Sequence, residues 1–324
     1  MSEARFAHAI NRALDDALER DSRVLLVGED IAKAGGVFGA TRGLFDKYGR
    51  ERVLDFPISE NAMAGVAVGL AMGGYRPVIE IMFMDFVALA MDGIVNQAAK
   101  LHFMFGGQGD VPLVVRTQHG GGLNAGPQHS QCLEAWFAHI PGLKVVCPAT
   151  LDDAYALLLA SIEDPNPVIF VEHKALYAMK GALSEPAPKA ELGVARIERA
   201  GSDVTIVTYG AMVHEALAAA RSLAEEGVDA EVINLRTLQP WDESAVLASL
   251  SRTHRLVVAH EAVEAFGVGA EIAARMAQIG FDELDGPIMR VGAQFLPIPF
   301  ARNLEKAVLP GAARIVEAVR ATHG

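Results

Sequence analysis

The chain has 324 residues, of which 51% are hydrophobic and only 21% are charged, and its formal net charge is −12. This length exceeds what a single hydrophobic core usually serves, so we expect two domains. The negative charge opposes binding to a phosphate backbone, and the sequence has no basic cluster that offsets it, which argues against a nucleic-acid partner.

Membrane and secretion signals are absent from the sequence pattern. The uncharged run that follows Glu60 covers residues 61–75, which is too short to span a bilayer. Cys132 and Cys147 are the only cysteines, and their spacing is not that of a metal site. Residues 1–5 lead into an amphipathic helical pattern without a secretory or transit signal. We therefore expect a cytoplasmic protein with no membrane segment.

Apolar, strand-like runs alternate with helical patterns in the first half of the chain. Helices are expected at 6–20, 85–101 and 152–163, and strands at 24–28, 52–56, 77–81, 112–116, 143–146 and 167–171. Continuous apolar strands that alternate with helices are typical of a parallel sheet covered on both faces. The pattern predicts a doubly wound α/β domain over residues 1–185.

A polar, proline-bearing stretch at 184–189 has no apolar periodicity and indicates a domain boundary. We place the linker at 186–194. A second alternating series follows, with strands at 204–208, 231–235 and 256–259 and a helix at 212–226. These elements predict a second α/β domain over residues 195–324.

Residues 57–74 form the most informative stretch. Glu60 falls in the first turn of a helix that continues without charge, and a helix that is apolar on every side is expected to be buried on every side. Gly65, Gly69 and Gly73 form a stripe along it, and each glycine costs about 1 kcal/mol relative to alanine. A backbone or a cofactor packed on the stripe would offset that cost. The helix dipole alone also favours an acid here, so a purely structural role for Glu60 stays open.

Two further motifs have both a chemical and a structural interpretation. His129 lies in a glycine-rich loop after a strand, where α/β proteins place ligands, and an imidazole there can bind an anion or move a proton. Alternatively, it only caps a helix that begins near Ser130. Gly267-Val268-Gly269 resembles part of a dinucleotide fingerprint but lacks the third glycine, so a helix N-terminal turn is the better interpretation and a NAD-linked dehydrogenase the weaker one.

Six motifs occur in order along both halves of the chain. They are Ile58-Ser59-Glu60, residues 80–86, 96–100, 128–131 and 141–146, and Arg236-Thr237-Leu238. Together they strongly resemble the β subunit of the E1 component of 2-oxo acid dehydrogenase complexes. This thiamine-diphosphate-dependent family includes pyruvate, branched-chain 2-oxo acid and acetoin dehydrogenases. The resemblance implies a transketolase-like pyrimidine-binding domain followed by a transketolase C-terminal α/β domain.

The resemblance also implies roles for individual residues. Glu60 is expected to hydrogen-bond a ring nitrogen of the aminopyrimidine, which favours the tautomer that removes the thiazolium C2 proton. Ile58, Met82 and Phe86 are expected to bind the cofactor, the last two as the pair that lines the pyrimidine pocket. His129 is expected near the substrate, where it holds the carboxylate or assists acyl transfer.

Metal sites and partners follow from the same resemblance. Ser161, Asp164 and Asn166 match the loop whose oxygens hold a structural potassium ion in some relatives. The sequence has no Gly-Asp-Gly, the segment with which thiamine enzymes bind magnesium and the diphosphate. An α subunit is therefore expected to hold Mg²⁺ and to complete the cofactor site in an α₂β₂ heterotetramer. Relatives usually have an acid where this chain has Gln294.

The function that the resemblance implies is that of an E1 β subunit, an oxidoreductase that is active only with its α subunit. The enzyme would oxidatively decarboxylate a 2-oxo acid and pass the acyl group to the lipoyl domain of E2, the dihydrolipoyl acyltransferase. Pyruvate is the first candidate substrate. Acetoin is second, because residues 104–107 and 173–177 look like those of acetoin enzymes, and branched-chain 2-oxo acids are third, on residues 238–242. A non-catalytic scaffold subunit is the remaining alternative.

Overall fold

The computed structural model describes residues 3–186 and 188–322. It divides into two compact units. Unit 1 contains the described residues up to His119 together with Trp136–Leu192, and unit 2 contains Gly120–Ala135 together with the described residues from Gly193 onwards. In the described ranges, no helix is both long and apolar enough to cross a membrane.

The sheet of unit 1 has the strand order β6-β7-β5-β4-β2-β3, and each of these pairings is parallel. Its strands are β2 (Val24–Gly28), β3 (Val53–Asp55), β4 (Arg76–Ile81), β5 (Val114–His119), β6 (Lys144–Val146) and β7 (Val168–His173). A short antiparallel pair, β1 (Glu3–Arg5) and β8 (Lys180–Ala182), lies apart from this sheet. The residues of β2, β5 and β7 are buried throughout, which explains the apolar run of β2 and the apolar residues that begin β5 and β7.

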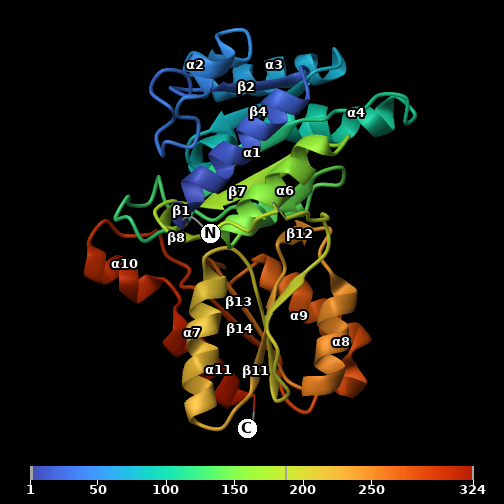
Figure 1. The fold of residues 1–324 in the computed structure, drawn as a ribbon. Coiled ribbons are helices and arrows are strands. Elements are labelled where there is room, and N and C mark those ends of the chain that lie inside the picture. Colours follow the sequence, from blue (N-terminus) through green and yellow to red (C-terminus); the bar gives the residue numbers. More distant parts are fainter. Residues whose placement is uncertain (1–2, 187, 323–324) are drawn as a thin grey trace. The chain divides into compact units, whose positions relative to one another are not determined.

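Helices cover the sheet of unit 1 (Figure 1). The helices α1 (Phe6–Arg20) and α6 (Leu151–Glu163) pack against each other, and α3 (Glu60–Met72) packs on β4. The side chain of Thr150 accepts a hydrogen bond from the backbone N–H of Asp153, which closes a capping box at the start of α6. Shorter helices are α2 (Leu44–Tyr48), α4 (Ala99–Met104), η3 (Lys174–Leu176) and α5 (Glu134–Ala138), which spans the point where the units divide.

The single helix expected at 85–101 is built from three kinds of turn. A 3₁₀ segment, η1 (Met84–Ala90), leads through Met91 into a π-helical segment, η2 (Asp92–Ala98), and then into α4. A Cβ atom added at Gly93 would lie 2.9 Å from the Cβ of Ala64 in α3, so the π segment approaches α3 very closely. Wide π turns are rare and often occur near functional sites.

Unit 2 has a second, mostly parallel sheet with the order β14-β13-β10-β11-β9, in which β9 pairs antiparallel with β11 at one edge. Figure 1 shows α7 and α11 on one face of it and α8 and α9 on the other. The strands are β9 (Arg196–Arg199), β10 (Val204–Thr208), β11 (Ala230–Asn234), β13 (Leu256–Val263) and β14 (Met289–Ala293). The other elements are α7 (Met212–Glu225), β12 (Thr237–Gln239), α8 (Glu243–Thr253), α9 (Val268–Ile279), η4 (Phe281–Glu283), α10 (Arg302–Val308) and α11 (Ala312–Ala321).

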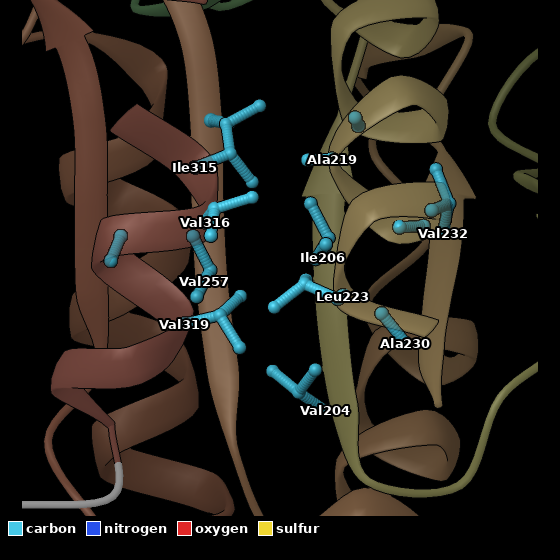
Figure 2. Packing of buried hydrophobic residues seen from close by; sticks show 14 of the residues in the cluster. Val204, Ile206, Ala219, Leu223, Ala230, Val232, Val257, Ile315, Val316 and Val319 are labelled. Carbon is cyan, nitrogen blue, oxygen red and sulfur yellow. The ribbon is translucent and has the colours of Figure 1, made fainter. Parts of the chain in front are cut away.

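The core of unit 2 lies between its sheet and the helices α7 and α11. Figure 2 shows Ile206 of β10 and Leu223 of α7 close to Val319 of α11, and all three are fully buried. The apolar positions of α7 follow the helical period, so one face of it points into this cluster. Unit 2 therefore has a hydrophobic core of its own.

The boundary differs in one respect from the prediction that residues 1–185 form the first domain. Gly120–Ala135 groups with unit 2, because carboxylates of unit 2 accept hydrogen bonds from its backbone N–H groups. Glu261 accepts from Gly121 at 2.6 Å, and Glu305 accepts from Gly122 at 2.9 Å. The later division falls between Leu192 and Gly193, which lie in the stretch proposed as the linker, 186–194.

The Gly267-Val268-Gly269 motif has a packing explanation. Gly267 is the N-cap of α9, as the helix-turn interpretation predicts. A Cβ atom at Gly269 would lie 2.8 Å from the imidazole of His260, which is fully buried. Nδ1 of His260 donates to the carbonyl oxygen of Ala262 at 3.1 Å, and burial lowers the pKa of the ring. The two glycines make room for a neutral histidine, which weakens the dinucleotide interpretation.

We expect Gly269→Ala to destabilise unit 2 by about 1–3 kcal/mol, because the new methyl group meets a fully packed ring. Urea denaturation of the full chain, followed by far-UV circular dichroism, which reports on both units, measures this loss. Gly65→Ala is the matched control, because a Cβ atom at Gly65 meets nothing within 4 Å. In the isolated chain the control should be neutral or stabilising by up to about 1 kcal/mol. Equal stability of the two variants would contradict the packing explanation.

Candidate active site

Glu60 is the first residue of α3 and is only 7% exposed. It follows β3 directly through residues 56–59, at the carboxyl end of the parallel sheet, where α/β proteins bind ligands. Ser59 takes the N-cap position, but its side chain makes no capping hydrogen bond in the described structure. The start of the helix favours the negative charge of Glu60, although a buried carboxylate still needs a partner.

A second buried acid, Glu29, lies close to Glu60. Burial raises the pKa of Glu29, the charge of Glu60 raises it further, and a hydrogen bond from the backbone N–H of Ser59 opposes the shift. Atom Oε1 of Glu29 is buried and has no hydrogen-bond partner among the described residues. A buried carboxyl group whose pKa is raised by burial and by a neighbouring carboxylate is typical of functional sites. The pair provides a polar acceptor for a ligand that brings its own hydrogen-bond donor.

Sequence reasoning missed Glu29, although a signal was present. The residue follows the apolar strand β2 without a gap, and β2 pairs in parallel with β3, the strand that leads to Glu60. Acids that directly follow two neighbouring buried strands are expected at the same edge of a sheet.

The other predicted cofactor residues of unit 1 lie at the same edge. Ile58 follows β3 and is 85% exposed, whereas Met82 follows β4 and is half-buried. Phe86 is half-buried in η1, and its ring meets that of Phe83 edge-on, with 6.1 Å between centroids. An exposed apolar residue beside buried acids is suited to covering a flat ring. The residues therefore fit an aminopyrimidine in chemical type, with an acid for a ring nitrogen and apolar side chains for the faces.

The backbone between Met82 and Phe86 is strained. Phe83 has φ 67° and ψ 122°, a conformation that a residue with a side chain rarely adopts and that costs about 1–3 kcal/mol. The backbone N–H of Phe83 donates to Oε1 of Gln118 at 3.2 Å. Such strain persists only where surrounding contacts hold it, and it often accompanies binding sites.

A buried ion-pair network extends from Gln118 into the sheet. Nε2 of Gln118 donates to the hydroxyl of Tyr177, which in turn donates to Glu172. Arg116, only 1% exposed, donates two hydrogen bonds to Glu172 at 2.7 and 2.8 Å and one to Glu80 at 2.6 Å. Burial alone lowers the pKa of Arg116, but the two carboxylates outweigh it, so the guanidinium stays charged. Sequence reasoning missed this network, because its members stand on separate strands without a local motif.

The expectation that α3 is buried on every side is wrong, because the helix is exposed along its glycine stripe. Its buried side chains face β4 and the η1–η2 segment, which cover one side only. The opposite face is exposed at Val66 and Met72, and Cβ atoms at Gly65 and Gly69 would meet nothing within 4 Å. The described residues therefore cover only one side of this helix, which carries no charge after Glu60.

His129 lies in the segment of unit 2 that follows β5. It is half-buried, and its backbone N–H donates to the carbonyl oxygen of Gly126 at 3.3 Å. The capping interpretation is wrong, because no helix begins near Ser130 and α5 starts only at Glu134. Gly120, Gly122, Asn124 and Gly126 of the preceding loop have positive φ, a conformation that does not continue into a helix.

The predicted potassium ligands lie near the end of α6, where the positively charged side chains of Lys144 and Arg76 already make contacts. The hydroxyl of Ser161 donates to the carbonyl oxygen of Leu157 at 2.7 Å. The carboxylate of Asp164 pairs with Lys144 and accepts from the backbone N–H of Asn166 at 2.9 Å. The guanidinium of Arg76 donates to the carbonyl oxygens of Ile162 at 2.7 Å and Asp164 at 3.3 Å. A potassium ion at Ser161, Asp164 and Asn166 stays a prediction.

Two family models match nearly the whole chain. The transketolase pyrimidine-binding domain matches residues 2–180, and the transketolase C-terminal domain matches residues 193–315. A solved split-gene transketolase, described as an inactive β4 tetramer, superposes with a TM-score of 0.81 at 24% identity and covers 98% of this chain and 97% of its own. The predicted fold class is confirmed, and the fold and matched domains define a two-domain transketolase-like protein.

Curated relatives narrow the class. The acetoin:2,6-dichlorophenolindophenol oxidoreductase β subunit of Cupriavidus necator is 47% identical, over 97% of this chain and 96% of its own. The corresponding Bacillus subtilis subunit is 46% identical, over 95% and 94%. The mitochondrial pyruvate dehydrogenase E1 β subunit of Dictyostelium discoideum is 44% identical, over 98% and 90%. The chain belongs to the family of E1 β subunits of 2-oxo acid and acetoin dehydrogenases, which confirms the resemblance seen in the sequence.

Proposed function

We propose that this chain is the β subunit of a thiamine-diphosphate-dependent E1 enzyme. With an α subunit it oxidatively decarboxylates a 2-oxo acid, with pyruvate as the first candidate, and transfers the acyl group to the lipoyl domain of E2. The observation that carries the proposal is the buried Glu60 at the start of α3, beside a second carboxylate at the carboxyl edge of a parallel sheet. A scaffold subunit without catalysis would gain nothing from two buried carboxyl groups close to each other.

Thiamine diphosphate, when bound, supplies the electron sink that the decarboxylation of a 2-oxo acid requires. Glu60 would hold a proton between its carboxylate and a ring nitrogen of the aminopyrimidine. Ile58, Met82 and Phe86 would cover the ring and exclude water, which strengthens that hydrogen bond. His129 would hold the carboxylate of the substrate or assist transfer of the acyl group.

A second polypeptide is needed to complete this site. The sequence offers no Gly-Asp-Gly with which to hold Mg²⁺ and a diphosphate, so we assign both to an α subunit in an α₂β₂ heterotetramer. The uncharged face of α3, with bare glycines at 65 and 69, supports this assignment, because small residues let another helix backbone approach closely. The relatives' printed names, each a β subunit, support it as well.

Acetoin is the second candidate substrate. Two of the relatives are β subunits of acetoin oxidoreductases, and their identities to this chain, 47% and 46%, are close to the 44% of the pyruvate dehydrogenase relative. The acetoin-like segments 104–107 and 173–177 favour the same substrate. We also propose a cytoplasmic location, supported by two cysteines that form no disulfide with each other, although some relatives are mitochondrial.

Turnover by the reconstituted enzyme tests the proposal. The chain would be co-expressed with a neighbouring α-type chain that contains Gly-Asp-Gly, and reduction of 2,6-dichlorophenolindophenol would be followed with pyruvate, acetoin and 3-methyl-2-oxobutanoate. We expect dye reduction that depends on added thiamine diphosphate and Mg²⁺, and fastest with pyruvate. Faster reduction with acetoin would replace the first candidate with the second. No reduction with any of the three would favour the scaffold interpretation.

A further inference from the structure

The loop that carries His129 is held by a segment near the C-terminus of the chain. We call residues 120–129 the glycine loop and residues 300–309 the clamp segment. The clamp segment contains α10, and both segments belong to unit 2. They meet at three points along the loop, and a carboxylate occupies the middle one.

The backbone of the glycine loop forms a concave site for an anion. Gly120, Gly122, Asn124 and Gly126 all have positive φ, between 57° and 89°, so every second residue is left-handed. The N–H groups of Gly122 and Asn124 point to the same carboxylate, and a backbone whose N–H groups converge in this way binds anions. Glycine and asparagine are the residues that adopt this conformation at least cost, which explains the composition of the loop.

The anion in this site is the side chain of Glu305, which is only 3% exposed. Its Oε1 accepts from the N–H of Gly122 at 2.9 Å, and its Oε2 accepts from the N–H of Asn124 at 3.2 Å and from Nδ2 of Asn124 at 2.9 Å. Hydrogen bonds to an ionised acceptor are about twice as strong as those between neutral groups. Nearby, Glu261 accepts from the N–H of Gly121 at 2.6 Å, so two carboxylates hold neighbouring amides.

Apolar contacts flank Glu305 on both sides. A Cβ atom at Gly121 would lie 2.6 Å from Cδ1 of Leu309, and one at Gly126 would overlap the ring of Phe300. The loop therefore has no room for a side chain at either position. Gly126 is also the residue whose carbonyl oxygen accepts the N–H of His129, so the clamp segment reaches the turn that carries the histidine.

We propose that Glu305 is a positioning residue for His129. Without its carboxylate, a loop with four glycines would sample many backbone conformations, because glycine loses more freedom on ordering than any other residue. The clamp fixes one of these conformations and thereby the direction of the imidazole. The role of His129 in this inference rests on the proposed function. The contact between Glu305 and the glycine loop does not.

Hydrogen exchange tests whether Glu305 orders the glycine loop, and steady-state kinetics test whether this order positions His129. In the full chain, we expect Glu305→Ala to speed amide exchange at Gly122 and Asn124 by at least about tenfold, since those amides lose their acceptor. In the reconstituted enzyme, we expect the KM for the 2-oxo acid to rise about tenfold or more, with the affinity for thiamine diphosphate unchanged. Glu305→Gln keeps one carbonyl acceptor and should restore part of both effects. Lys306→Ala, at the next and exposed position of α10, is the matched control.

A double variant distinguishes positioning from general stability. In a His129→Ala background, we expect Glu305→Ala to change kcat/KM by less than about twofold, because the two residues act as one unit. An undiminished loss in that background would overturn the positioning role, as would unchanged exchange in the single variant. Should Glu305→Ala fail to fold, Glu305→Gln provides both readouts. If the wild-type enzyme turned over none of the three substrates, the proposed function would fail, and exchange alone would still decide the clamp.

Discussion

Replacing Glu60 with glutamine is expected to lower kcat of the reconstituted enzyme by about a thousandfold, within the range that a positioned acid–base group contributes. The amide keeps the volume of the carboxylate and its place at the start of α3, but it cannot exchange a proton with a ring nitrogen. Dye reduction with the preferred substrate measures the effect, and size-exclusion chromatography checks that assembly is retained. Glu51→Gln is the control, because Glu51 is an exposed carboxylate that lies ahead of β3.

Wild-type activity in Glu60→Gln would support the scaffold interpretation. The titration of Glu29 provides a second measurement on the same variant. Because the charge of Glu60 contributes to the raised pKa of Glu29, its removal should shift the titration of Glu29 to lower pH, while burial keeps the pKa above the ordinary value. Isotope-edited infrared spectra of the carboxyl groups would follow this shift. An unchanged titration would mean that the two acids are not coupled.

The second large effect is expected in the buried ion-pair network. Arg116→Met should destabilise unit 1 by about 3–5 kcal/mol, because it leaves Glu80 and Glu172 buried without their cation. Fluorescence of Trp136 in a Trp241→Phe background would report on unit 1 during urea unfolding, since the chain has one tryptophan in each unit.

A surface ion pair provides the control for Arg116→Met. Arg275 donates to Glu243 at 2.6 and 3.0 Å, and both side chains are more than a third exposed. Arg275→Met should therefore cost no more than about 1 kcal/mol, measured in unit 2 from Trp241 in a Trp136→Phe background. Adding Glu80→Gln and Glu172→Gln to Arg116→Met should recover part of the lost stability, because the unpaired charges are removed. Equal losses for Arg116→Met and Arg275→Met would contradict the assigned role of the network.

The fold could be predicted because its evidence is local. Apolar runs such as residues 24–28 and 168–171 lie in strands that are buried along their whole length. Helices with a strong apolar period, such as Phe6–Arg20, appear where the pattern places them. Glu60 could be singled out for the same reason, since an acid followed by a long uncharged helix is visible in the sequence.

The parts that the sequence did not predict depend on contacts between distant segments. Arg116 appears in the sequence as a charge inside an apolar strand, and only the neighbouring strands show which carboxylates neutralise it. The π turn at η2 follows from its close approach to α3 and not from its composition. The exposure of one side of α3 was not predicted for a different reason. The sequence indicates that a surface is apolar, but not whether this chain itself covers it.

Gly142 belongs to the motif at residues 141–146, and its surroundings explain why the motif is needed. Its φ is 99°, and a Cβ atom there would overlap the carbonyl oxygen of Ala99, at the junction between η2 and α4. Lys100 donates to the carbonyl oxygen of the preceding residue, Pro141, at 2.7 Å. The motif is thus a requirement of chain packing, and a descendant that had lost all turnover would still need it to fold. Its presence in a genome therefore traces ancestry, and under the proposed function it is Glu60 that would separate working enzymes from relatives that have kept the architecture alone.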